Sequence, residues 1–317
     1  MTFNYEFRCL LARLRAPLLS AIVFAFAACD NPDPTEPTAV SDPVAAAEPA
    51  GDLQPSFASA YQGGIPFGFL RQPNTAFGVL YSGAKQTLGP NYIMGSLREA
   101  KARGGKVFVM LADHEKFYKD GNGHFSFTKW KARIDRFRGL NLNQYITDGT
   151  IIGHFMIDEP QDPANWNGRP LTAAQLEAMA KYSKQLWPSM VTVVRAPPTK
   201  LRWTGVYRYL DAAWAQVENV RGNLNLNSWY SANISAAKAE GLALVVGLNV
   251  SKGNVNRTRM TATQVRSWGS TLLNSTYPCA FMSWVYDPDF ARGSHGDAMR
   301  ILRSKAQNRA KKSCRGS

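Results

Sequence analysis

Cysteine and histidine are scarce in this chain, which narrows the chemistry open to it. Its 317 residues include four cysteines and four histidines. Two of the cysteines precede residue 30, so only Cys279 and Cys314 remain for the folded part. Neither residue type has the spacing typical of a metal site. The sequence therefore predicts no metal, although a metal-dependent hydrolase of another class remains an alternative.

Glycine-rich phosphate motifs are also missing. The chain contains no G-x-G-x-x-G, no P-loop and no G-x-S-x-G. The first two would direct backbone N–H groups at phosphates, and the third would expose a nucleophilic serine. We therefore predict no cofactor and no Ser-His-Asp triad.

Acidic residues are outnumbered, 23 against 37 Lys and Arg, which gives a formal charge of +14. The segment from Arg300 to Arg315 has several basic residues and no acid. Such a tail either contacts anionic lipid or acidic polysaccharide, or is a solvated helix face. Nucleic acid is not the expected partner, because the N-terminus indicates export.

No apolar run is long enough to span a membrane, which takes roughly 20 residues. The longest, Pro17 to Ala28, follows a basic start and ends in small residues, as secretory signals do. Its end, Phe26-Ala27-Ala28-Cys29, resembles the lipobox of bacterial lipoproteins. That resemblance implies that Cys29 is lipidated and becomes the new N-terminus. Ordinary cleavage after Ala27 is the alternative.

Residues 30–56 are rich in Pro, Ala and acids and contain no Lys or Arg. Such a segment buries too little apolar surface to order itself, and its prolines keep it extended. We expect a signal peptide (1–29), a disordered tether (30–56) and one folded domain (57–317). This organisation predicts a lipid-anchored protein on the periplasmic or extracellular face of a bacterial cell envelope. In that oxidising setting Cys279 and Cys314 either form a disulfide or remain unrelated thiols.

Beyond the tether, strand-length apolar runs alternate with helix-period segments. The expected strands are 65–70, 77–81, 106–111, 151–157, 191–195, 212–217, 242–249 and 280–286. Helices are indicated over 92–102, 127–137, 231–240 and 297–307, and by capping boxes at Thr172 and Thr261. Eight such units predict a closed (β/α)8 TIM barrel, with an open doubly wound sheet as the alternative.

The sharpest motif is the fourth expected strand, which runs into Asp158-Glu159-Pro160. Here the chain resembles the TIM-barrel glycoside hydrolases, whose fourth strand ends in Asn-Glu or Asp-Glu before Pro. The resemblance implies that Glu159 is the general acid/base and that Asp158 contacts the sugar. The structural alternative is that Asp158 caps the next loop and Glu159 pairs with a barrel arginine.

A second carboxylate is needed to attack the sugar or activate water. In many relatives it ends the seventh strand, where this chain has Asn249. Glu218 is the best substitute, because Trp214, Gln216 and Glu218 share one face of the sixth strand. Alternatively, Trp214 is core and Glu218 is a solvated loop residue. Further candidates are Asp113, Asp287 and Asp289.

Two more candidates lie in predicted strands. Trp284 is similar to the eighth-strand aromatic residue that forms a sugar platform in these enzymes, and ordinary core packing is its alternative. Arg195 binds an acidic sugar, orients Glu159 or forms a structural ion pair. The sequence thus predicts a glycoside hydrolase acting on a poly- or oligosaccharide. A non-catalytic carbohydrate-binding lipoprotein on the same scaffold is the main alternative.

Overall fold

The structure is a computed structural model of the chain and describes residues 63–201 and 205–317. The predicted signal peptide, the lipidation site Cys29 and the tether therefore lie outside the described residues. Among the helices of the described ranges, none has the length and apolar character needed to cross a membrane.

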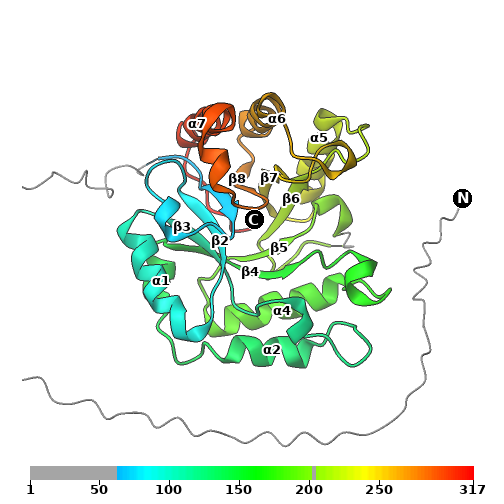
Figure 1. Ribbon diagram of the computed structural model, residues 1–317. Helices are drawn as coiled ribbons and strands as arrows, with labels where there is room; N and C mark the ends of the chain where they lie inside the picture. Colours follow the sequence, from blue (N-terminus) through cyan, green and yellow to red (C-terminus); the bar gives the residue numbers. More distant parts are fainter. Residues whose placement is uncertain (1–62, 202–204) are drawn as a thin grey trace, which may run out of the picture. The chain divides into compact units, whose positions relative to one another are not determined.

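Eight parallel strands close into a barrel that is surrounded by helices (Figure 1). Strands pair in chain order, and β8 returns to β1, where Phe67 lies opposite Phe281. The strands are β1 (Phe67–Leu70), β2 (Gly83–Thr87), β3 (Lys106–Met110), β4 (Ile151–Asp158), β5 (Thr192–Arg195), β6 (Ala212–Val217), β7 (Ala243–Leu248) and β8 (Pro278–Ser283). The predicted TIM barrel is confirmed, and the pairing of the first and last strands rules out the open sheet.

The second strand does not lie where we predicted it. The apolar run 77–81 forms only an isolated bridge between Phe77 and Tyr81. The strand that pairs with β1 and β3 is Gly83–Thr87, which reads Gly-Ala-Lys-Gln-Thr. The prediction was wrong because β2 buries polar side chains, Lys85 and Gln86, that line a cavity. Hydropathy therefore does not mark this strand.

Seven α-helices lie in the described part of the chain, and their ends follow local capping chemistry. Each predicted capping box is present, with Thr172 and Thr261 accepting from the glutamine N–H three residues on. The helix after β6 begins at Leu226 rather than at the predicted Ser231, because the Asn225 side chain caps it. The helices are α1 (Pro90–Ala102), α2 (Phe127–Asp135), α3 (Asn143–Thr147), α4 (Ala173–Leu186), α5 (Leu226–Ala239), α6 (Ala262–Asn274) and α7 (Gly293–Gln307).

Alternate strand residues face the barrel interior and the surrounding helices. On β6, Ala213 and Ala215 pack with the apolar residues beneath the helices. Trp214 faces inward, with its ring centroid 5.6 Å from that of Phe155 and 6.4 Å from that of Phe108. The predicted inward face of β6 is confirmed, and these rings fill the barrel below the carboxyl ends of the strands.

The C-terminal tail closes the amino end of the barrel. Cys314 forms a disulfide with Cys279 at the start of β8, and both residues are buried. The Ser317 N–H donates to the Gly241 carbonyl, just before β7, at 3.0 Å. Accordingly, the C-terminus lies near the centre of the barrel in Figure 1. Of the two possibilities for these cysteines, the disulfide is the one that the structure contains.

Opening the disulfide should destabilise the barrel. It joins residues 35 apart, and closing a loop of that length in the unfolded chain corresponds to about 3–4 kcal/mol. We expect Cys314→Ser to lower the free energy of unfolding by about that amount, measured by urea denaturation. Cys279→Ser is the matched variant, and equal stability of the oxidised and reduced wild type would contradict the prediction.

Candidate active site

A cavity of about 950 Å³ opens at the carboxyl end of the barrel. Every strand contributes to its wall with its last residue or with the residue that follows it. These residues are Leu70, Thr87, Met110, Asp158, Arg195, Glu218, Asn249 and Trp284. The carboxyl end is where TIM-barrel enzymes carry their active sites, so this cavity is the candidate site.

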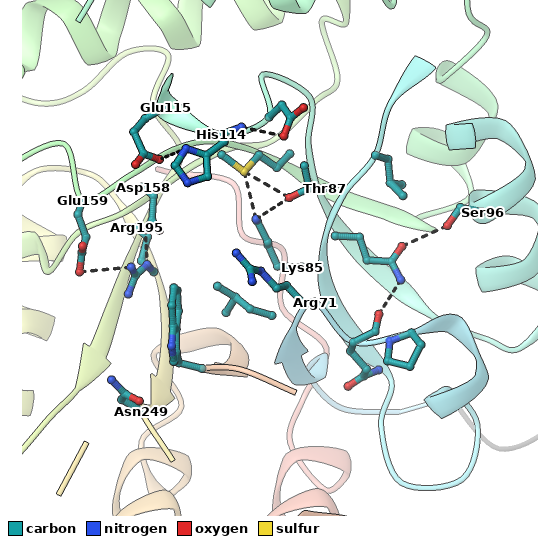
Figure 2. Close-up of a pocket in the computed structure, with 18 of the residues that line it drawn as sticks. Arg71, Lys85, Thr87, Ser96, His114, Glu115, Asp158, Glu159, Arg195 and Asn249 are labelled. Atoms are coloured by element: carbon teal, nitrogen blue, oxygen red, sulfur yellow. Dashed lines mark hydrogen bonds and ion pairs between the residues drawn. The ribbon is translucent and has the colours of Figure 1, made fainter. Parts of the chain in front are cut away.

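Arg195, the last residue of β5, organises one side of the cavity. Its guanidinium is buried and forms ion pairs with Asp158 and, at 3.2 Å, with Glu159 (Figure 2). Nη1 also donates to the Gln216 side-chain oxygen at 2.7 Å. The guanidinium carbon lies 4.3 Å from the centroid of the Trp284 ring. Arg195 therefore joins side chains from three other strands, β4, β6 and β8.

The backbone of Glu159 is fixed on both sides. Its N–H donates to the Arg195 carbonyl at 3.0 Å, which continues the pairing of β4 with β5. Its own carbonyl accepts from the Trp166 indole at 3.1 Å. The residue has φ 41°, a left-handed conformation that is uncommon outside glycine. Such strained residues concentrate at functional sites, and this one directs the carboxylate toward the cavity.

The environment of Glu159 favours its protonated form. Partial burial raises the pKa of this carboxyl above its ordinary value, and the charges of Asp158 and Glu218 raise it further. Arg195 and a hydrogen bond from the Asn165 amide act in the opposite direction, but the net shift of the pKa is upward. A carboxyl that holds its proton above its usual pH range is suited to donate it.

Glu218 follows β6 and is held by the strand next to it. The Asn249 amide nitrogen donates to a Glu218 carboxylate oxygen at 2.9 Å. Asn249 follows β7. In this chain, Asn249 therefore supports a carboxylate that comes from the adjacent strand. Glu159 and Glu218 both line the cavity.

Two predicted site residues do not line the cavity. Trp214 is fully buried in the barrel interior, so the structure places it in the core rather than at the sugar site. It lies too deep along β6 to reach the cavity. Gln216 lies two residues further along β6. It contacts the site indirectly, through its hydrogen bond to Arg195. Asp158, Arg195, Asn249 and Trp284 all line the cavity as expected.

Two of the three additional acidic candidates pair with arginines. Asp113 lines the cavity and pairs with Arg133 at 2.9 Å. Asp287 pairs with Arg259, and neither Asp287 nor Asp289 lines the cavity. Of these three acids, only Asp113 therefore reaches the cavity, and it is held by an arginine.

Lys85 also lines the cavity, although the sequence did not predict it. Its Nζ lies 3.0 Å from the Thr87 hydroxyl and 3.1 Å from the Met110 sulfur, and 4.8 Å from the centroid of the Phe155 ring. Burial lowers the pKa of Lys85 to about 8, outweighing the opposing effect of Asp158. Correct placement of β2 would have revealed it, since Lys85 and Thr87 then share the inward face.

The described residues offer no metal cage. In the ranges 63–201 and 205–317, no three His, Cys, Asp or Glu side chains are grouped so that they could hold a metal ion. The buried His154 instead contacts the Ser183 hydroxyl at 2.9 Å through Nδ1. Burial lowers the pKa of this imidazole to about 3, so His154 is a neutral core residue.

Solved structures similar to this one include two proteins that are named as a cellulase and a β-glucanase. One is a cellulase in complex with an inhibitor, with 12% sequence identity and a TM-score of 0.51 over 76% of this chain and 92% of the cellulase. The other is a β-glucanase from Saccharophagus degradans, with 9% identity and a TM-score of 0.53 over 78% of this chain and 89% of the glucanase. The barrel has the fold of these glycoside hydrolases.

The likeness is therefore one of fold, and the resemblance drawn from the Asp-Glu-Pro motif is confirmed at that level. No protein-family model and no curated protein matches the sequence.

The buried Lys85 should make stability depend on pH. Its folded-state pKa of about 8 lies below the ordinary 10.5, so its neutral form is favoured by folding. The wild type therefore loses stability as pH falls from about 10.5 to about 8, by about 3 kcal/mol at most, and the penalty is constant below that range. We expect Lys85→Met to raise the free energy of unfolding at pH 7, with a smaller gain at pH 10, measured by urea denaturation. An unchanged or lowered stability at pH 7 would contradict this.

Proposed function

We propose that this protein hydrolyses glycosidic bonds in a poly- or oligosaccharide. The observation that carries the proposal is the meeting of Glu159 and Glu218 on the wall of one cavity, with the pKa of Glu159 raised. Hydrolysis of this kind needs one carboxyl to give a proton and a second carboxylate to act on the sugar.

In this mechanism Glu159 protonates the glycosidic oxygen, which is otherwise a poor leaving group. Glu218, oriented by Asn249, attacks the anomeric carbon or activates a water molecule. When Glu159 has given up its proton, its negative charge is stabilised by the Arg195 guanidinium 3.2 Å away. The half-buried Trp284 supplies an apolar ring surface against which a sugar can pack.

The structural relatives support carbohydrate as the substrate class, since those compared above are a cellulase and a β-glucanase. The predicted N-terminal segments add a location to the proposal. A lipid on Cys29 and the tether that follows would hold the barrel at the surface of a bacterial envelope, where polysaccharides are accessible.

One observation favours a second function, that of a non-catalytic carbohydrate-binding protein. The strand β7 is followed by an amide, Asn249, where many relatives of the fold have the second acid, and Glu159 is already engaged by Arg195. Saturable glycan binding without turnover, unaffected by Glu159→Gln, would support this alternative.

Removing the proposed proton donor should abolish turnover while preserving the fold. Glu159→Gln is expected to lower kcat by ~10²-fold or more, the usual effect of losing a general acid. Glu218→Gln should have an effect at least as large. The measurement is reducing-sugar release from a polysaccharide panel, with the exposed α7 variant Asp297→Asn as a control that retains activity. Full activity of Glu159→Gln would remove Glu159 from the mechanism.

The pH profile should report the raised pKa of Glu159. Because the general acid must be protonated, kcat/KM should fall as pH rises through this pKa, at a higher pH than an ordinary glutamate would give. The Asn165 amide lowers this pKa by its hydrogen bond to the carboxylate. Asn165→Ala should therefore move the alkaline limb to higher pH, and a shift to lower pH would count against the assignment.

A further inference from the structure

On the cavity wall the negative side chains have protein partners, whereas several positive side chains have none among the described residues. Each carboxylate has a protein partner: Glu99 pairs with Arg103, Asp113 with Arg133, Glu115 with His114, Asp158 and Glu159 with Arg195, and Glu218 with the Asn249 amide. Among the described residues, four cations on the same wall have no carboxylate within ion-pair distance. They are Arg71, Lys85, Lys252 and Arg257.

Lys85 carries the most weight among these cations. Its side chain is only slightly exposed, and its nearest polar atoms are a hydroxyl and a thioether, neither of which is charged. Removing an ammonium group from water without a counter-ion is costly. A cost of this kind is retained where a ligand supplies the missing negative charge.

Arg71 increases that cost and points to the same ligand. Its backbone N–H donates to the Lys85 carbonyl at 2.8 Å, and Figure 2 shows its side chain beside Lys85. The positive charge of Arg71 disfavours the charged form of Lys85. Arg71 also has φ 58°, a left-handed conformation rare for a non-glycine residue. Two like charges held together in this way form a site for an anion.

Lys252 and Arg257 extend the positive wall on the opposite side of the carboxylates. The Lys252 N–H donates to the Asn249 side-chain oxygen at 3.0 Å, and Asn249 in turn holds Glu218. Arg257, in the same loop, also has a positive φ of 59°. The Glu159–Glu218 pair is therefore flanked by unpaired cations from the β1–β2 side and from the β7–α6 side.

Aromatic surface, by contrast, is limited. Trp284 is the single Phe, Tyr or Trp among the described residues of the cavity wall, and Arg195 lies over its ring. A neutral glucan would gain more from aromatic platforms than from cations, because its rings present C–H faces and no charge. The four unpaired cations instead favour a sugar that carries negative groups.

We propose that the substrate is a uronic-acid-containing polysaccharide, with Lys85 and Arg71 binding the carboxylate of one sugar unit. Lys252 and Arg257 bind the carboxylate of a second sugar unit, on the other side of the glycosidic bond that is cleaved. This inference rests on the proposed glycan-active site and specifies its substrate class. The ligand carboxylate adds negative charge beside Lys85, where the attraction of Asp158 and Asp113 does not outweigh burial.

The test compares two ligands that differ only in charge. Short β-1,4-linked glucuronic acid oligomers are matched by their carboxyl-reduced forms, which are cello-oligosaccharides. Binding is measured by titration calorimetry on the Glu159→Gln protein, so that hydrolysis consumes no ligand. Galacturonic and mannuronic acid oligomers, each with its reduced form, complete the panel.

We expect at least one uronate oligomer to bind tenfold or more tightly than its reduced form. Adding Lys85→Met or Arg71→Met should abolish most of that difference. Lys311→Met, an exposed change in the C-terminal tail, is the matched control and should preserve it. Thermal unfolding confirms that each variant is folded.

Three results would overturn the inference. They are equal affinity for every charged and reduced pair, a uronate preference that survives both cavity substitutions, and equally tight binding, at the same residues, of a sulfated cello-oligosaccharide that contains no uronic acid. The outcome is separable from that of the proposed function. Turnover of cello-oligosaccharides without uronate preference would support the proposed hydrolysis and contradict the uronate site. Uronate binding without any turnover would support the uronate site and contradict the proposed hydrolysis.

Discussion

The arrangement of the cavity depends on one buried guanidinium. Burying Arg195 is costly, and the cost is offset only when its donors find acceptors in fixed positions. Those acceptors are Asp158 and Glu159 from the end of β4 and Gln216 from β6. The same group that neutralises the acids also fixes where they lie. Arg195 therefore determines the position of the proposed proton donor and, through its ring contact with Trp284, that of the aromatic side of the site.

The barrel allows a catalytic group to move from one strand to its neighbour. Backbone pairing fixes the eight strand ends in a ring, but it does not specify which end carries which side chain. Here Glu218, the second carboxylate that we propose, follows β6, and Asn249, which follows β7, holds it by a hydrogen bond. In the proposed mechanism the second carboxylate therefore comes from the β6 end and is oriented by the β7 end.

Along the barrel axis, the interior changes within a few residues from an apolar core to the charged base of the cavity. The rings of Trp214 and Phe155 fill the lower part, and Lys85 lies directly over Phe155. This change explains why β2 escaped prediction, since its inward residues belong to the cavity and not to the core. It also sets Lys85 in surroundings that oppose its charge, a state that a bound anion would relieve.

The sequence by itself determined the period of strands and helices, the capping boxes at Thr172 and Thr261, the barrel class and the acid Glu159 at the end of β4, because each is encoded in residues close together in the chain. How deep each inward-facing side chain lies along the barrel axis was decided only by tertiary structure. Trp214 and Trp284 both face inward, yet one is core and the other lines the cavity. The partners of Arg195, the support of Glu218 and the Cys279–Cys314 disulfide join residues on different strands or at a strand and the tail. Such pairings follow from closure of the barrel, which brings distant strand ends together and which no local pattern records.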